Sequence, residues 1–430
     1  MQKQGTLREF GHYAAMNILG MIGISCYILA DTFFVAQGTG SLGLAALNIA
    51  IPGYNLMNGI GLMIGVGAAT QYTIARAQND RKKADSVFTH ASALGLLLAL
   101  VFMLCGVFFA QPIARLLGAD AQTLGMTTTY LRLLWCFAPF FIMNNVLLAF
   151  TRNDGAPTIA MCGMIAGSLF NIVFDYVFIF PCGLGMFGAA LATGISPIVS
   201  ILVLTAHLRK PERGFHAVRT HLYASRMPAL CAPGLSSLIG EIASGVVLLR
   251  LSDNTGVAAY GVVANLALVG IAIFTGLCTG MQPLVSRSSG RNDREQLKKL
   301  FRWGTVTALA IAAVLYAAVF VFAEPLTAAF NSEHDPQLAE YAIGGLRIYF
   351  AGFLCAGFNM VTAAFFSASD KTMQGFIISL LRGVIVVPPV LFPLAWALGV
   401  NGVWMTFPVV ELVTAVVALV WARKYIVMGN

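Results

Sequence analysis

The stretch PTIAMCGMIAGSLFNIVFDYVFIF, residues 157–180, holds a single charged residue, Asp175, in 24 positions. A helix of that length rises about 36 Å, enough to cross the hydrocarbon core of a bilayer. Comparable apolar runs recur along the whole chain. They lie near residues 12–37, 44–69, 86–110, 125–150, 185–207, 228–251, 257–282, 301–323, 342–366, 373–397 and 401–422. The sequence therefore predicts an all-α, polytopic membrane protein with twelve transmembrane helices.

The composition excludes an ordinary soluble protein. Of the 430 residues, 58% are hydrophobic and only 10% are charged, whereas soluble domains carry about 25% charged residues. The net charge of +8 does not indicate a nucleic-acid partner, because the basic residues lie in short loops between apolar runs. The eight cysteines form no CxxC pair, so neither a disulfide framework nor a zinc site is predicted. We expect no cofactor.

The basic residues also set the expected orientation in the membrane. With both termini in the cytoplasm, most of the 26 Lys and Arg residues fall on the inner side. The exceptions are Arg115, Arg132, Arg250, Arg347 and Arg382. Cytoplasmic loops of membrane proteins carry such an excess of positive charge. We therefore expect a multi-pass protein of the bacterial inner membrane with both termini inside.

Short matches relate the two halves of the chain. An offset of 213 residues separates NDR at residues 79–81 from NDR at 292–294, and the same offset separates GLAAL at 43–47 from GVAAY at 256–260. Because six is an even number, two copies of six spans enter the bilayer in the same orientation, with a cavity between them near the midplane. Such an internal duplication favours a transporter.

The duplication predicts two lobes joined by a linker. Each lobe would contain six spans, and the junction would be the longest basic loop. The predicted parts are an N-terminal lobe at residues 1–210, a basic cytoplasmic linker at 211–226 and a C-terminal lobe at 227–430.

Acidic residues inside the apolar runs are the candidate working groups. Of the 18 acidic residues, all but four lie in loops or near span ends, and those four are Asp31, Asp175, Glu241 and Glu411. A carboxylate in hydrocarbon costs roughly 2.5–3.5 kcal/mol on insertion scales, so it usually faces a cavity and binds something.

Three spans of the first half present polar groups at one depth. Asn171 precedes Asp175 by one helical turn, which places both side chains on one face of the helix. At 1.5 Å per residue, Asp31 and Asp175 each lie about 9 Å from the outer ends of their spans, and Thr193 lies at a similar depth. Such oxygen ligands suit Na⁺, or the carboxylates can exchange protons. The alternative for Asn171 and Asp175 is polar packing between helices.

The second half lacks this arrangement. At the repeat offset, Asn171 and Asp175 correspond to positions near Ile385 and Pro389 in VIVVPPV, so the ion site is expected in the first half alone. Glu241 and Glu411 are candidate counter-charges for a cationic substrate. For each, the alternative is a buried ion pair with an arginine, namely Arg382 or Arg347.

At these residues the chain resembles the multidrug and toxic compound extrusion (MATE) family over essentially its whole length. The similar segments are ADTFFVAQ at 30–37, LNIAIP at 47–52, FNIVFDYVFIF at 170–180 and GAALAT at 188–193. The resemblance implies twelve helices in two pseudo-symmetric six-helix lobes that form a V. It also implies efflux of organic cations driven by inward sodium or proton gradients.

The resemblance assigns roles to particular residues. In many members, residues matching Asp31, Asn171, Asp175 and Thr193 form a cation site in the first lobe, and all four are present here. Glu241 matches an acidic residue that some members carry on span seven. Members that rely on a second-lobe site often have an aspartate on span ten, where this chain has Asn359. We therefore count Asn359, with Glu241 and Glu411, as a candidate substrate-binding residue.

Together these observations predict a secondary antiporter, not an enzyme. It would act as a monomer in the lipid bilayer and export cationic or amphiphilic compounds in exchange for Na⁺ or H⁺. One alternative is a flippase for a lipid-linked saccharide or another amphiphilic precursor, which would need a basic cavity for its anionic substrate. A membrane receptor or membrane-embedded enzyme is a weaker alternative, because the sequence shows neither a nucleophile with a base nor a signalling domain.

Overall fold

The part of the protein that the computed structural model describes is almost entirely helical, with short turns and loops between the helices. That part comprises residues 7–211, 213–220, 227–235, 238, 254–330, 336–369 and 371–427. No strand occurs among these residues. The predicted all-α membrane fold is confirmed.

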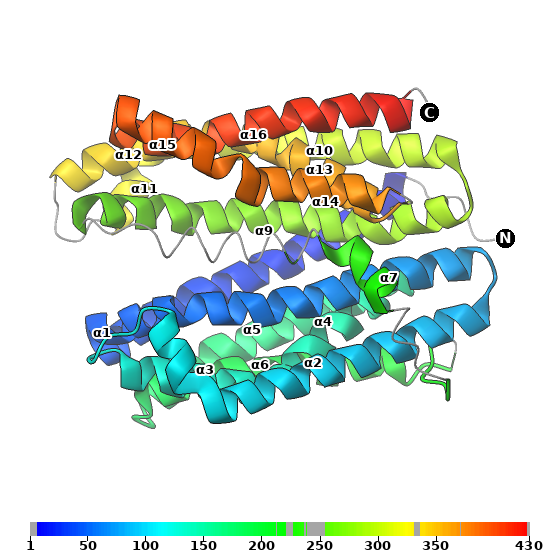
Figure 1. The fold of residues 1–430 in the computed structure, drawn as a ribbon, viewed down its shortest axis with the longest axis horizontal. Coiled ribbons are helices and arrows are strands. Elements are labelled where there is room, and N and C mark those ends of the chain that lie inside the picture. The colour runs from blue at the N-terminus through cyan, green and yellow to red at the C-terminus, as the bar shows by residue number, and fades with distance from the viewer. Residues whose placement is uncertain are drawn as a thin grey trace.

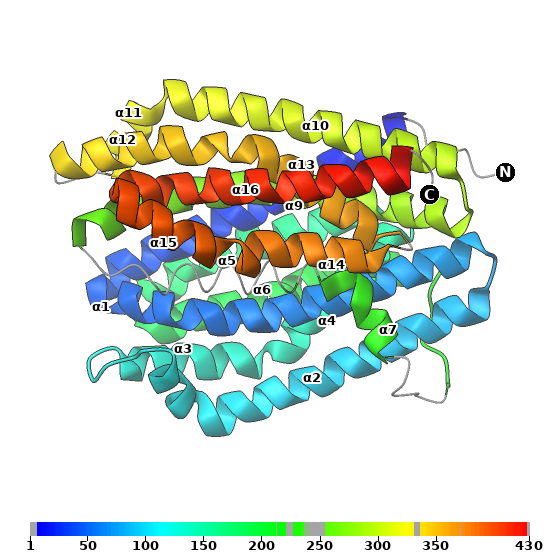
Figure 2. The ribbon, with the colours of Figure 1, turned by 45° about the horizontal axis from the view of Figure 1, so that its top comes forward.

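The first lobe consists of helices from the N-terminal half of the chain (Figure 1). They are α1 (Leu7–Ala77), α2 (Arg81–Leu116), α3 (Leu124–Cys136), α4 (Ala138–Asn153), α5 (Pro157–Ile179) and α6 (Gly185–Leu208). Within α1, Gly40 has φ 71° and divides the helix into two spans, 7–40 and 42–77. A glycine suits this joint because a positive φ is strained for residues that carry a Cβ atom. Helices α2 and α3 lie side by side at the edge of this lobe (Figure 2).

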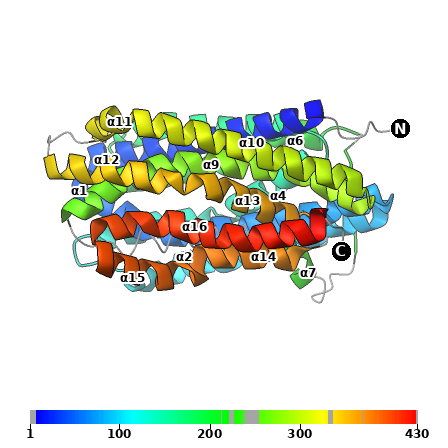
Figure 3. The same ribbon diagram turned by 90° about the horizontal axis from the view of Figure 1, so that it is seen from above.

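The second lobe repeats the pattern with shorter pieces. Its elements are α7 (Met227–Cys231), η2 (Ala232–Gly234), α9 (Asn254–Gly290), α10 (Arg294–Val321), α11 (Ala323–Phe330), α12 (Pro336–Ala351), α13 (Phe353–Ser367), α14 (Thr372–Leu380), η3 (Leu381–Ile385), α15 (Val387–Leu398), α16 (Val400–Ala422) and η4 (Arg423–Val427). Seen from above, α10, α13 and α16 run side by side (Figure 3). Each lobe is built around a hydrophobic core, and the two cores exchange residues: Phe10, Tyr13 and Ala14 of α1 belong to the second core, and Leu230 of α7 belongs to the first.

The spans match the prediction where the structure describes them. Among the described residues, 9 helices are long and apolar enough to cross a membrane, and two bent helix pairs raise the total to 11. The predicted span 228–251 begins with α7 and η2, and most of its remainder lies outside the described residues. Glu241 lies outside them as well.

Two local features repeat between the halves. Asn79 and Asn292, of the two NDR matches, both have positive φ, at 62° and 54°. In each match the following aspartate, Asp80 or Asp293, caps the next helix by accepting a hydrogen bond from a backbone N–H three residues on. The equivalent spans α3–α4 and α12–α13 are also both broken, with bends of 52° and 42°. The short sequence matches therefore correspond to the same local structure in both halves.

The lobes meet where α1 lies against α9, close to the end of the bundle that carries both chain termini (Figure 1). We call that end of the bundle the basic end. Three glycines of α9 bring the two backbones together: a Cβ atom would lie 2.6 Å from Ile18 Cα at Gly276, 2.7 Å from Tyr13 O at Gly280 and 2.9 Å from Ile74 Cα at Gly290. We call this contact the glycine seam.

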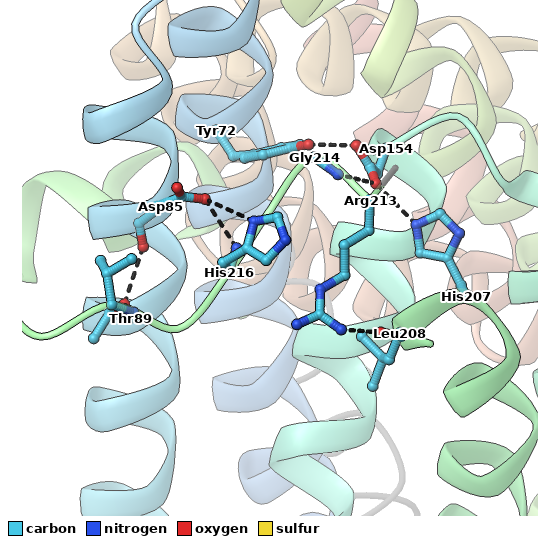
Figure 4. Close-up of polar contacts among 10 residues, drawn as sticks. Tyr72, Asp85, Thr89, Asp154, His207, Leu208, Arg213, Gly214 and His216 are labelled. Carbon is cyan, nitrogen blue, oxygen red and sulfur yellow. Dashed lines mark hydrogen bonds and ion pairs between the residues drawn. The ribbon is translucent and has the colours of Figure 1, made fainter. Parts of the chain in front are cut away.

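The chain after α6 is fastened to the first lobe at Asp154, which follows α4 (Figure 4). The Asp154 carboxylate accepts hydrogen bonds from the Tyr72 hydroxyl and from the Gly214 N–H at 2.8 Å, and it lies 2.9 Å from His207 Nε2. Burial raises the pKa of Asp154, but the hydrogen bonds from His207, Gly214 and Tyr72 outweigh burial and hold that pKa below its ordinary value of 3.8. Asp154 is therefore an ionised carboxylate at the basic end that connects three separate parts of the chain.

A second attachment holds the same segment farther along. Asp85 accepts from the backbone N–H of His216 at 2.9 Å, and Thr89 Oγ1 accepts from that of Val218 at 3.1 Å. The described part of the predicted linker thus lies against α2 and α4 of the first lobe (Figure 4).

Candidate functional site

The structure brings the two predicted first-lobe carboxylates together. Asp31 on α1 is 7% exposed and Asp175 on α5 is fully buried. Their carboxyl groups interact directly, side chain to side chain. The contact arises because α1 packs along α5 and both residues lie in the half of their helices remote from the basic end. Asp31 and Asp175, which counting along the sequence placed at the same depth, thus lie at the same level in the structure.

Asn171 links this pair to Thr193 on α6. With the amide oriented to satisfy both of its ends, the nitrogen donates to Asp175 Oδ2 at 2.9 Å, and the oxygen accepts from Thr193 Oγ1 at 3.2 Å. Asn171 is fully buried and Thr193 is 4% exposed. All four predicted cation-site residues therefore form one continuous polar cluster, which we call the acid pocket.

Tyrosines surround the acid pocket, and the sequence did not single them out. Tyr27, one helical turn before Asp31, bonds Tyr54 hydroxyl to hydroxyl at 3.1 Å. The Tyr130 hydroxyl of α3 interacts with that of Thr193. The spacing of Tyr27 from Asp31 is a signal that could have been used. For Tyr54 and Tyr130 the sequence has none, because tyrosines are common in apolar helices.

The acid pocket places two carboxyl groups together with few partners. Among the described residues, no lysine, arginine or histidine forms an ion pair with Asp31 or Asp175. One oxygen of each carboxyl group, Oδ1, is buried without a hydrogen-bond partner. Two charged carboxylates in contact repel each other strongly in a buried site. Either one of them takes up a proton or a cation lies between them. Among the described residues, the acid pocket therefore has no fixed positive charge to neutralise its carboxyl groups.

The second-lobe acid has a different environment. Glu411 on α16 is 2% exposed, and the Arg382 guanidinium lies 2.7 Å from its Oε1. Asn359 on α13 donates to Glu411 Oε2 at 2.7 Å and to its backbone carbonyl at 2.8 Å. The alternative of a buried pair with Arg382 is thus the arrangement seen. Substrate binding by Asn359 and Glu411 stays a prediction, as does that by Glu241.

Arg382 reaches Glu411 from a widened helical turn. It belongs to the π-helical segment η3, which interrupts the span formed by α14 and α15. Such π turns often occur at functional sites. The other arginine considered as a partner, Arg347, instead lies 3.7 Å from Glu324 and 5.1 Å from the Phe320 ring centre. Asn359 and Arg382 together satisfy Glu411, in contrast to the acid pocket.

Comparison with known proteins gives consistent results. The MatE family model matches residues 17–177 and, a second time, residues 232–392. The multidrug export protein MepA of Staphylococcus saprophyticus is 26% identical over 428 residues, covering 97% of this chain and 94% of that protein. MepA of Staphylococcus aureus is also 26% identical, with the same coverage of both chains.

The fold has close structural counterparts. The solved structure of a MATE multidrug transporter, DinF-BH, superposes with a TM-score of 0.91 at 23% sequence identity. The alignment covers 99% of this chain and 97% of that one. At this level of identity the likeness shows the fold, and it confirms the predicted two-lobed architecture.

Proposed function

The chain belongs to the MatE family of membrane transporters, and on that premise we propose that it is a secondary antiporter that exports cationic or amphiphilic organic compounds in exchange for Na⁺ or H⁺. The acid pocket carries the proposal, because Asp31 and Asp175 are buried together with no ion-pair partner among the described residues. A site of that kind favours a mobile cation over an empty state.

The acid pocket suits either coupling ion. The direct contact of the Asp31 and Asp175 carboxyl groups fits a shared proton. The Thr193 hydroxyl, which the Asn171 amide connects to Asp175, adds a neutral oxygen to the cluster, which fits Na⁺. In both cases the entering charge removes the repulsion between the two carboxylates. The ion thereby stabilises the packing of α1 against α5.

Coupling follows if the acid pocket differs between two states of the lobe. An ion shifts an equilibrium only by its difference in affinity for the two states. The pocket joins α1, α5 and α6 through three residues, Asp31, Asp175 and Thr193, so a movement of any one helix changes its ligands. We propose that ion binding and release move these helices and thereby release the exported compound.

The remaining features of the proposal follow the predicted topology. We propose an inner-membrane location with both termini in the cytoplasm, and function as a monomer. The proposed lobes and linker keep their predicted bounds, 1–210, 211–226 and 227–430. Asn359, Glu411 and Glu241 remain proposed contacts for a cationic substrate.

The test is efflux of a fluorescent organic cation from vesicles that contain the purified protein. Sodium and pH gradients are imposed separately, for the parent and for Asp175→Asn. We expect one of the two gradients to drive transport by the parent, and neither to drive transport by the variant. The control is Asp120→Asn, the same chemical change in an exposed loop, which should behave as the parent does. Transport that ignores both gradients and survives Asp175→Asn would overturn the proposal.

A further inference from the structure

A cavity of about 560 Å³ lies at the basic end, on the boundary between the two lobes. The first lobe contributes the end of α1, the start of α2 and the turn after α4, and the second lobe contributes the end of α9. Its volume lies within the range of small-molecule sites, roughly 300–1,000 Å³. The cavity is therefore large enough for an organic ligand rather than for water alone.

Four arginines give the cavity its character. Arg76 and Arg81 come from the first lobe, and Arg287 and Arg291 come from the second. Of the described residues that line it, Asp154 is the one carboxylate, and Asp154 is already held by His207, Gly214 and Tyr72 (Figure 4). Arg287 also pairs with Glu9 at 2.8 Å. With Asp154 and Glu9 both counted, the four arginines still leave the cavity a net positive charge.

The repeated turns fix where these arginines stand. Arg81 follows the turn at Asn79 and Asp80, and Arg291 precedes the equivalent turn at Asn292 and Asp293. Each turn is set by a positive φ and by the capping carboxylate. Two pseudo-symmetric turns, one from each lobe, thus present arginines to one space, so the positive charge there is pre-organised.

We propose that this cavity binds a phosphate-bearing organic anion, with the phosphoryl group among the four guanidinium groups. Guanidinium groups match phosphate oxygens in geometry as well as in charge, through paired N–H donors. The site is separate from the acid pocket, since it lies at the helix ends and has the opposite charge. It also differs from the midplane cavity expected for a flippase.

Bound anion would connect the lobes. Because Arg76 and Arg81 belong to one lobe and Arg287 and Arg291 to the other, a ligand that contacts both sets stabilises the state in which the basic end is closed. A ligand that binds one state in preference shifts the population toward that state. The anion thus acts as a regulator of the closed basic end, and its source is either a lipid headgroup or a soluble phosphate ester.

The experiment separates these two sources. The purified protein is placed in nanodiscs of phosphatidylcholine, and its thermal unfolding midpoint is measured as glycerol 3-phosphate is added. In parallel, the midpoint is measured in nanodiscs that contain phosphatidylglycerol without the soluble ester. Both arms are run for the parent, for Arg81→Gln and Arg291→Gln, and for Lys82→Gln. The last is a matched control, because Lys82 adjoins Arg81 but does not line the cavity.

We expect the midpoint of the parent to rise in at least one arm, and the same rise in Lys82→Gln. Each arginine variant should need about tenfold more anion for the same rise, the effect of losing one charge-assisted hydrogen bond. A rise with phosphatidylglycerol alone identifies a lipid headgroup, and a rise with glycerol 3-phosphate identifies a soluble ester. The absence of any rise, or a rise equal in the arginine variants and in Lys82→Gln, overturns the proposal.

Discussion

Both lobes bury carboxyl groups among their helices, but the polar groups that face those carboxyl groups differ between the lobes. In the first lobe Asp31 and Asp175 face each other, with an amide and a hydroxyl as neighbours. In the second lobe Glu411 faces the guanidinium group of Arg382 at 2.7 Å. The halves share their turns and broken spans, but the span that carries Arg382 is interrupted by the π-helical segment η3, whereas α5 is one continuous α-helix.

The contrast indicates which lobe can bind an ion reversibly. A carboxylate paired with an arginine of the same chain is already neutralised. A cation from solution would have to displace that arginine, which the polypeptide chain holds in place. The carboxylate pair of the first lobe has no such partner among the described residues, so in our proposal a cation from solution neutralises it. The first lobe is therefore suited to the coupling ion, while Glu411 can attract a cationic substrate only if Arg382 moves away.

The largest effect is expected from Asp31→Asn. The variant keeps the shape of the side chain but removes one of the two charges that the coupling ion neutralises. Gradient-driven efflux in vesicles should fall by about 100-fold or more, whereas the thermal unfolding midpoint should not fall, because a buried charge without an ion-pair partner has been removed. Efflux at the parental rate would break the comparison between the lobes.

The second-lobe pair is expected to affect stability before transport. Arg382→Met leaves Glu411 buried without its cation, which should destabilise the protein by about 3–5 kcal/mol. The double variant Arg382→Met/Glu411→Gln should recover most of that loss, because neither side chain is then charged. Equilibrium unfolding in detergent measures both. If the single variant is as stable as the parent, Glu411 is not neutralised by Arg382, and the two lobes are more alike than the geometry indicates.

A smaller effect is expected at the edge of the acid pocket. Thr193→Val keeps the volume of the side chain but removes the hydroxyl that donates to Asn171. The Na⁺ or H⁺ concentration for half-maximal transport should rise about tenfold, the loss of one hydrogen bond near a charge. Thr193→Ser retains the hydroxyl and should stay near the parental value. An equal shift in both variants would assign Thr193 to packing alone.

The smallest effect concerns Asp154, a buried carboxylate that Tyr72, Gly214 and His207 hold by hydrogen bonds. Its pKa is lowered in the folded protein, so its stabilisation is present above the ordinary value of 3.8 and is lost as pH falls through the lowered pKa. Protection of the amides of residues 209–210 and 213–219 against hydrogen exchange, relative to the intrinsic rate at each pH, should therefore persist at pH 7 and pH 5 and fall only below about pH 4.

Asp154→Asn provides the matched measurement. The amide cannot accept all three hydrogen bonds as strongly, so exchange at Gly214 should be faster at every pH, by an amount that corresponds to about 1–2 kcal/mol. Asp120→Asn, at the opposite end of the first lobe, should leave it unchanged. Equal exchange in the parent and in Asp154→Asn would show that Asp154 does not fasten this segment.

Much of the fold could be predicted from the sequence, because each span needs its own long apolar run. The predicted ends were too short where polar residues continue a helix: the run at 86–110 belongs to a helix from Arg81 to Leu116, and that at 257–282 to one from Asn254 to Gly290. Hydropathy marks the hydrocarbon core, whereas the helix continues into the interface until a turn such as that at Asn79 or Asn292 ends it.

The acid pocket could be predicted because its members share a helix face or a depth, and both follow from counting residues. The choice of Arg382 over Arg347 as the partner of Glu411 could not, since it depends on the π-helical turn. The same is true of Tyr54 and Tyr130, and of the arginine cavity, whose members meet only when the two lobes pack. Contacts between helices distant in sequence leave no periodic trace in the chain.

The glycine seam described above has a mechanical consequence. At Gly276, Gly280 and Gly290 the lobes touch backbone to backbone. Because glycine has no side chain, separating the lobes there requires no rotamer change at these three positions and breaks no interdigitated side-chain packing of theirs. We therefore expect the α1–α9 contact at the three glycines to open and close reversibly. A methyl group at any of the three positions would collide with the α1 backbone and keep the two lobes apart at the basic end.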